Sequence, residues 1–141
     1  MAEREEKISA EPGTVNVMVY SDNRTVREEV IAAIGTHLAS DLPEINWVEA
    51  ATWPGAELKV QEREISLLIL DAEAKKLGGI GLGKKVRDEY VPDMPYIVLI
   101  ARPQDEWLAR SAAPNAILQY PIQPREISRE AARILREKLA K

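Results

Sequence analysis

Residues 65–71 read Ile-Ser-Leu-Leu-Ile-Leu-Asp, an almost unbroken apolar run that stops at an acid. A run without alternation of polar and apolar residues predicts a strand that is covered on both of its faces. A second run of the same kind lies at Tyr96-Ile97-Val98-Leu99-Ile100. Strands of this type belong to parallel sheets that lie between two layers of helices, so these two segments predict an α/β fold.

The segments around these two runs repeat the same alternation of strand and helix. Strand character is found at residues 15–20, 45–49 and 116–119, and helical periodicity at 24–38, 54–61, 79–90, 104–112 and 124–139. In the first helix, Val26, Val30, Ile34 and Leu38 recur every fourth residue. Five β-α units predict a doubly wound parallel sheet with right-handed crossovers.

The chain of 141 residues is long enough for one domain, which we expect at residues 14–141 without an attached output domain. Residues 1–13 are polar and end in Glu-Pro-Gly, so we expect a flexible tail. No export signal or membrane-spanning run is visible, which predicts a cytoplasmic protein.

Composition excludes several kinds of chemistry. The chain has no cysteine, and its single histidine is His37, so thiolate, zinc-cysteine and most histidine-dependent mechanisms are excluded. The net charge of −4 argues against a protein that grips nucleic-acid phosphates over its whole surface.

In sheets of this kind, functional groups gather at the carboxyl ends of the strands. The residues there are Ser21-Asp22, Asp71, Ile100-Ala101 and Tyr120-Pro121. With these residues in place, the stretch from about Val15 to Leu139 resembles the CheY-like receiver domain of two-component response regulators. The resemblance implies a flavodoxin-like three-layer sandwich with strand order 2-1-3-4-5. In that family, two acids and the third-strand aspartate hold Mg²⁺, and that aspartate accepts a phosphoryl group from a histidine kinase.

The resemblance places Asp71 at the phosphoacceptor position, with Gly79 at the spacing of the third helix. Matching Arg27 to the arginine common in the family's first helix places Ser21 and Asp22 at the acidic pair. Only the second acid remains, so Asp22 and Asp71 are a vestigial metal site. Mg²⁺ binding is expected to be weak, because this cation needs several oxygen ligands.

Three further positions depart from the family pattern. Ile100 replaces the hydroxyl residue after the fourth strand, Tyr120 replaces the lysine after the fifth, and Ile117 replaces the aromatic switch residue. Losing one preorganised donor typically costs about 10²- to 10³-fold in rate. We therefore expect a degenerate receiver, with Asp71 as a vestigial phosphoacceptor and no catalytic residue.

The segment Gly78-Gly79-Ile80-Gly81-Leu82-Gly83-Lys84-Lys85 nearly matches a phosphate-binding loop and keeps a small nucleotide-binding enzyme open as an alternative. Lys85 stands where Ser or Thr should hold magnesium, and residues 72–77 separate the segment from its strand.

A binding surface is predicted near the end of the chain. Arg125, Arg129 and Arg133 lie on one helical stripe, and Trp107 belongs to the preceding short helix. Receivers generally bind partners through the fourth helix, fifth strand and fifth helix, and Trp with Arg is typical of binding hot spots. A solvated helix face with ion pairs is the alternative.

We expect a scaffold or accessory subunit that binds a protein and neither nucleic acid nor, directly, a membrane. Orphan receiver-like proteins of this sort resemble actinobacterial accessory subunits, one of which is associated with respiratory complex I. That partner implies a location on the cytoplasmic side of the inner membrane. A phosphorylatable single-domain response regulator in a phosphorelay is the other alternative.

Overall fold

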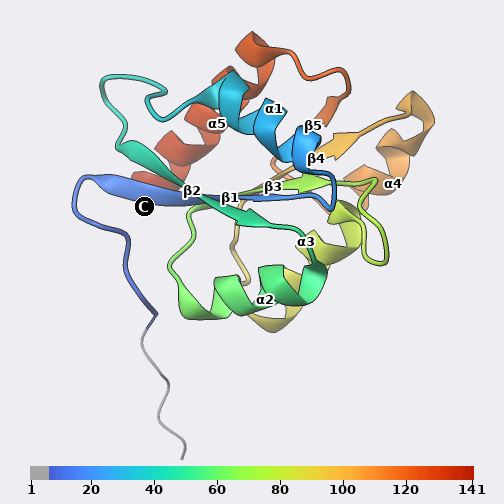
Figure 1. Ribbon diagram of the computed structural model, residues 1–141, viewed down its shortest axis with the longest axis horizontal. Helices are drawn as coiled ribbons and strands as arrows, with labels where there is room; N and C mark the ends of the chain where they lie inside the picture. Colours follow the sequence, from blue (N-terminus) through green and yellow to red (C-terminus); the bar gives the residue numbers. More distant parts are fainter. Residues whose placement is uncertain (1–6) are drawn as a thin grey trace, which may run out of the picture.

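The computed structural model describes residues 7–141 as one parallel sheet between two layers of helices (Figure 1). The strand order β2-β1-β3-β4-β5 confirms the expected doubly wound topology. The elements are β1 (Thr14–Tyr20), α1 (Arg24–Ile34), β2 (Glu44–Ala50), α2 (Trp53–Glu62), β3 (Leu67–Asp71), α3 (Gly79–Glu89), β4 (Tyr96–Ile100), η1 (Pro103–Asp105), α4 (Glu106–Arg110), β5 (Ala116–Gln119) and α5 (Pro124–Leu139).

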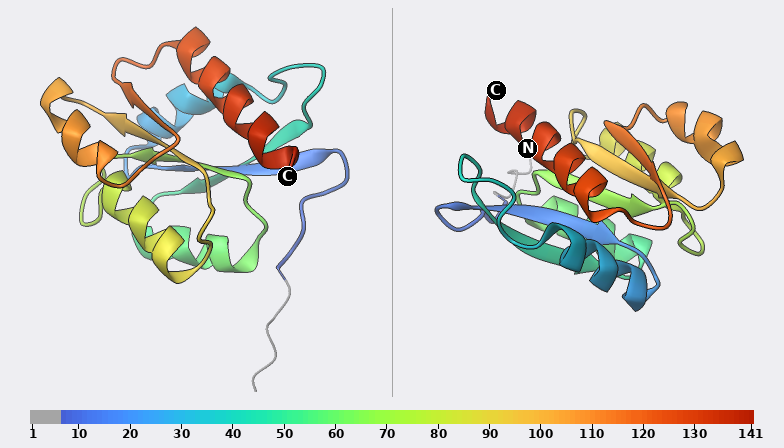
Figure 2. Two further views of the ribbon diagram at one scale, coloured as in Figure 1. Left: turned by 180° about the vertical axis from the view of Figure 1, so that it is seen from behind. Right: turned by 90° about the horizontal axis from the view of Figure 1, so that it is seen from above.

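Each face of the sheet carries its own hydrophobic core. Helices α1 and α5 cover one face, and α2 and α3 cover the other, as the view from behind also shows (Figure 2). Every residue of β3 and β4 is buried, which explains why these two strands lack polar alternation. Helix α4 lies beside the edge strand β5 and contributes only Ala109 to the buried core.

Two helices differ from the sequence prediction. Helix α1 ends at Ile34 because Gly35 takes a φ of 73°, a conformation that favours glycine. Leu38 and the exposed His37 therefore lie in the following loop, although the fourfold spacing predicted a longer helix. The helix predicted at 104–112 is a 3₁₀ turn followed by the five residues of α4. Within residues 7–141, no helix is long and apolar enough to cross a membrane.

The glycine-rich segment lies largely inside helix α3, so it does not form the loop that cradles a phosphate. Gly79 and Gly83 instead allow α3 to pack closely against Leu70 of β3 and Tyr96 of β4. A Cβ on Gly79 would lie 2.7 Å from the Cβ of Leu70, and one on Gly83 would lie 2.5 Å from the ring of Tyr96. The near-match to a nucleotide-binding motif is therefore explained by helix-to-sheet packing.

The predicted tail is only partly described, because residues 1–6 lie outside the described residues. Ile8 forms a parallel bridge with Arg63, in which its N–H donates to Glu62 O at 2.8 Å and its carbonyl accepts from Glu64 N at 2.9 Å. The chain is thereby attached to the connection between α2 and β3 before β1 begins.

Candidate functional site

An open depression of about 700 Å³ lies at the carboxyl edge of the sheet. Its walls come from the loops that follow β1, β3, β4 and β5, where the sequence predicted functional groups. The lining residues are Asp22, Asn23, Arg24, Val26, Asp71, Glu73, Lys75, Ala101 and Tyr120.

Asp71 ends β3 and is only 3 % exposed. Its Oδ2 accepts a hydrogen bond from the Ser21 hydroxyl at 2.7 Å, and its Oδ1 accepts from the Glu73 N–H at 2.9 Å. The Ser21 Oγ itself accepts from the Asn23 N–H at 3.0 Å, so the hydroxyl proton is free to point at Asp71. Both carboxylate oxygens therefore have neutral donors.

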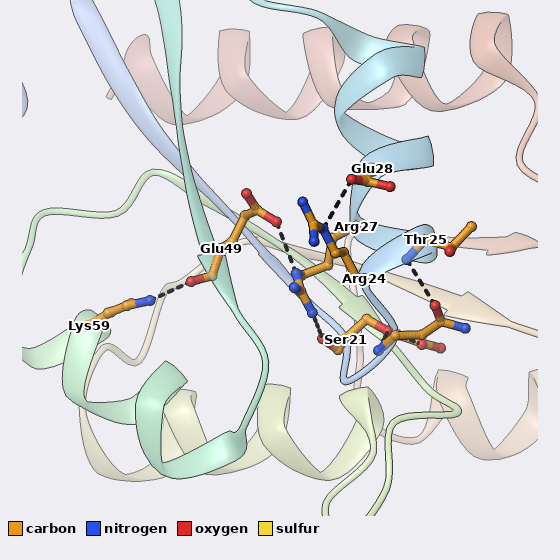
Figure 3. A network of polar contacts seen from close by, with 9 residues as sticks. Ser21, Arg24, Thr25, Arg27, Glu28, Glu49 and Lys59 are labelled. Carbon is orange, nitrogen blue, oxygen red and sulfur yellow. Dashed lines mark hydrogen bonds and ion pairs between the residues drawn. The ribbon is translucent and has the colours of Figure 1, made fainter.

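Ser21 is held from behind by a network that joins β1, α1 and β2 (Figure 3). Arg27 Nη1 donates to the Ser21 carbonyl at 2.7 Å, and Arg27 Nε donates to Glu49 Oε1 at 2.9 Å. The Lys59 ammonium donates to the Glu49 carbonyl. Sequence reasoning used Arg27 only to align the chain, whereas the structure shows that it positions the strand end that carries Ser21.

Asp22 lies apart from this buried group. Its side chain is exposed, and its Oδ2 accepts from the Lys75 N–H at 3.3 Å across the depression. The two predicted metal-ligating acids thus face the same depression, but only Asp71 is buried.

Tyr120 follows β5, and its N–H donates to the Ile100 carbonyl at 2.9 Å. Its ring packs against the α1/α5 core, and its hydroxyl is buried without a hydrogen-bond partner among residues 7–141. Burial, followed by the negative charge of Asp71, raises the pKa of Tyr120 well above its ordinary value. The phenol is therefore neutral, and it lines the same depression as Asp71.

The other two positions that depart from the expected pattern lie outside the depression. Ile100 is buried in the core on the α2/α3 side, and Ile117 is half-buried against the same core. The exposed neighbour of Ile100, Ala101, contributes only a methyl group to the lining. The depression therefore receives no hydroxyl from the end of β4.

Few carboxylates are placed where they could hold a magnesium ion. Within residues 7–141, no three acidic or histidine side chains come together as a metal site would require. Both oxygens of Asp71 already accept hydrogen bonds, and Asp22 is the second carboxylate of the predicted pair. Magnesium commonly takes one or two carboxylates but demands near-octahedral geometry around them.

The predicted binding residues lie on α4 and α5. Trp107 is 73 % exposed, and Leu108 beside it is 45 % exposed. Arg125 and Arg129 are exposed, and neither forms an ion pair with another described residue. Arg133, by contrast, is paired with Glu130 at 2.7 Å and with Glu137 at 3.3 Å.

Comparisons with known proteins agree with this geometry. No family model matches the chain. An uncharacterised response regulatory protein of Mycobacterium tuberculosis is 38 % identical over 122 residues, which span 86 % of this chain and 92 % of that protein.

Two solved structures have the same fold. The receiver domain of Francisella response regulator 1452 has a TM-score of 0.74 at 16 % identity, covering 87 % of this chain and 98 % of its own. A response regulator described as putative, from Chloroflexus aurantiacus, also has a TM-score of 0.74, at 22 % identity and the same coverage of the two chains.

Proposed function

The chain belongs to the response regulator family, and from this premise we propose that it is an atypical receiver that acts by binding another protein. The observation that carries the proposal is the state of Asp71. This carboxylate is buried, both of its oxygens accept hydrogen bonds, and the residue facing it after β5 is Tyr120.

Transfer of a phosphoryl group to Asp71 would need cations and donors positioned on that carboxylate, and neither Arg24 nor Lys75, which line the depression, forms an ion pair with it. The transferred group carries charge on three oxygens, and catalysis depends on positioned cations that stabilise this charge. A neutral phenol at position 120 and an apolar side chain at position 100 offer little of this stabilisation. Efficient phosphorylation of Asp71 is therefore not expected, and Mg²⁺ is expected to bind weakly at Asp22 and Asp71.

The surface of α4 and α5 supports the second half of the proposal. Trp107 and Leu108 are large apolar side chains exposed on a short helix, and Arg125 and Arg129 are exposed on α5. Aromatic residues and arginine dominate the energetics of protein interfaces. Respiratory complex I is the partner that the resemblance suggests, which would place the protein in the cytoplasm beside the inner membrane.

Phosphoryl mimicry tests the first half. We expect that beryllofluoride with Mg²⁺ at low millimolar concentration leaves the amide NMR signals around Asp71 unchanged. A variant that restores the family residues, Ser21→Asp with Ile100→Thr and Tyr120→Lys, is the positive control. Saturable shifts in the unmodified protein would instead support the phosphorylatable response regulator.

Partner capture from native lysate tests the second half, with recovery of complex I subunits as the readout. Trp107→Ala and Arg129→Glu are each expected to lower recovery at least about tenfold, as for interface residues worth more than 1.4 kcal/mol. Leu58→Ala and Lys84→Glu are matched controls, because they change exposed residues of the same kinds on α2 and α3. Recovery unaffected by both α4 and α5 variants would refute the proposed surface.

A further inference from the structure

Asp71 is a buried anion without a cation. No lysine or arginine forms an ion pair with it among residues 7–141, and Lys75, which lines the same depression, contributes its backbone N–H to Asp22. Buried charges are costly unless they are paired or hydrogen-bonded. The donors that Asp71 does have must therefore carry the stability of its charged form.

Those donors come from different strand ends. Ser21 follows β1, and the Glu73 amide belongs to the loop after β3. Tyr120, whose hydroxyl makes no hydrogen bond among residues 7–141, follows β5. The direction of the Ser21 bond is settled by its surroundings. Because the Asn23 N–H donates to Ser21 Oγ, the hydroxyl proton is the part of Ser21 that remains for Asp71.

Tyr120 completes this group. A buried hydroxyl that makes no hydrogen bond costs about as much free energy as the loss of a hydrogen bond. Among the nearby acids, Asp71 has the largest effect on the pKa of Tyr120. Tyr120 and Asp71 line the same depression, so the carboxylate is an acceptor that this phenol can face. Charge-assisted hydrogen bonds of this kind are the strong ones.

We propose that Ser21 and Tyr120 are positioning residues whose hydroxyls hold Asp71 as a hydrogen-bond acceptor, joining the ends of β1, β3 and β5 without any metal or phosphoryl group. The carboxyl edge of the sheet then has one stable conformation, whatever the supply of phosphoryl donors. This inference deepens the proposed function, because a fixed edge suits a protein that binds its partner constitutively.

The proposal determines the sign of a mutational effect. Where several carboxylates crowd together, neutralising one relieves repulsion and stabilises the protein. Here hydrogen-bond donors contact both oxygens of Asp71, so Asp71→Asn removes acceptor capacity and places an NH₂ group against a hydroxyl or an amide. We expect Asp71→Asn to lower the Tm of the full chain by about 3–6 °C. Asp22→Asn, which changes the exposed neighbouring acid, is the control and is expected to leave the Tm within about 1 °C.

A double-mutant cycle tests the two hydroxyls. Ser21→Ala and Tyr120→Phe are each expected to lower the Tm by a few degrees, and to have much less effect when Asp71→Asn is already present. The ¹³Cζ NMR signal of Tyr120 supplies a readout that loss of packing alone would not move. It should shift in Asp71→Asn and stay in place in Asp22→Asn.

Ser21→Asp is expected to destabilise the protein and to regain stability when Mg²⁺ is added, because it introduces a second buried carboxylate. The proposal would be overturned if Asp71→Asn were as stable as the unmodified protein. It would also be overturned if Ser21→Ala and Tyr120→Phe lowered the Tm as much in the Asp71→Asn background as in the unmodified protein. These measurements contain no partner, so their failure would leave partner capture as a separate test of the proposed function.

Discussion

Two ionised side chains at opposite ends of the sheet are both held by neutral groups. Asp71, at the carboxyl edge, accepts from a hydroxyl and an amide. Arg87, in α3 near the amino end of β4, donates to Met94 O at 2.8 Å, Ala113 O at 2.7 Å and Asn115 Oδ1 at 2.9 Å. Its guanidinium also lies 4.2 Å from the centre of the Tyr96 ring, and it forms no ion pair within residues 7–141.

The two sites differ in what they leave free. The three nitrogens of Arg87 are engaged from three directions, and the result is a closed connection between α3 and the loop before β5. Asp71 lies beside an open depression and a phenol without a partner. A charged side chain whose hydrogen-bonding atoms are all paired with neutral groups has a purely structural role, as Arg87 does. A charged side chain that still borders an open depression, as Asp71 does, retains the surroundings of a binding site.

The largest effect is expected from breaking the Arg87 connection. Arg87→Met keeps the apolar stem but leaves the carbonyls of Met94, Ala112 and Ala113 and the Asn115 amide oxygen without the guanidinium. We therefore expect a loss of about 3 kcal/mol in the free energy of unfolding. Urea unfolding measures it. Lys84→Met, on the exposed side of the same helix, is the control. A loss below about 1 kcal/mol would mean that water replaces the guanidinium at little cost.

A smaller loss is expected from disturbing the ring beneath Arg87. Gly83→Ala puts a Cβ 2.5 Å from the buried Tyr96 ring, so we expect destabilisation of about 2 kcal/mol despite the better helix propensity of alanine. Gly81→Ala is the matched variant, because its Cβ meets only the flexible end of Leu77 at 2.8 Å. It should be neutral or slightly stabilising, and equal costs at both positions would show that packing on Tyr96 is not the cause.

Tyr96→Phe changes the same region and is expected to cost less unfolding free energy. The Tyr96 hydroxyl donates to the Ala112 carbonyl at 2.5 Å, so its removal should cost about 1 kcal/mol in unfolding free energy. The amide of Ala113, which follows that carbonyl, should exchange hydrogen faster in the variant. Unchanged exchange and stability would indicate that Arg87 alone secures the loop.

The subtlest test of the comparison is the ionisation of the two phenols. Burial raises the pKa of Tyr96, but Arg87 opposes the rise, whereas burial and Asp71 both raise the pKa of Tyr120. A raised folded pKa favours the neutral form, so this contribution to stability is complete below the unfolded pKa of 10 and is lost as the pH rises above it. We expect a ¹³Cζ NMR titration to show that Tyr96 ionises at a lower pH than Tyr120. Arg87→Met should raise the pKa of Tyr96 and so reduce the difference between the two pKa values. Ionisation of Tyr120 at a lower pH than Tyr96 would contradict the placement of Tyr120 near Asp71 and of Tyr96 near Arg87.

Much of the fold was predictable because its signals are local. The apolar runs at β3 and β4 follow from burial on both faces, and the strand ends indicated the edge of the sheet at which Asp71 and Tyr120 lie. The end of α1 was missed because Gly35 stops the helix while the fourfold spacing continues to Leu38. The role of Arg87 was missed because its partners lie up to 28 residues away, and no spacing rule connects them.

The sequence by itself determined the order of the elements, the parallel sheet and the residue types at the strand ends, because hydrophobic periodicity and composition act over short stretches of chain. Only the tertiary structure decided that the Ser21 hydroxyl meets Asp71, that Arg27 holds Ser21 in place, and that the Tyr120 phenol is buried beside them. Such contacts depend on where distant backbone segments lie to within a fraction of an ångström. Residue type alone does not specify that placement, since hydrogen bonds are short and directional.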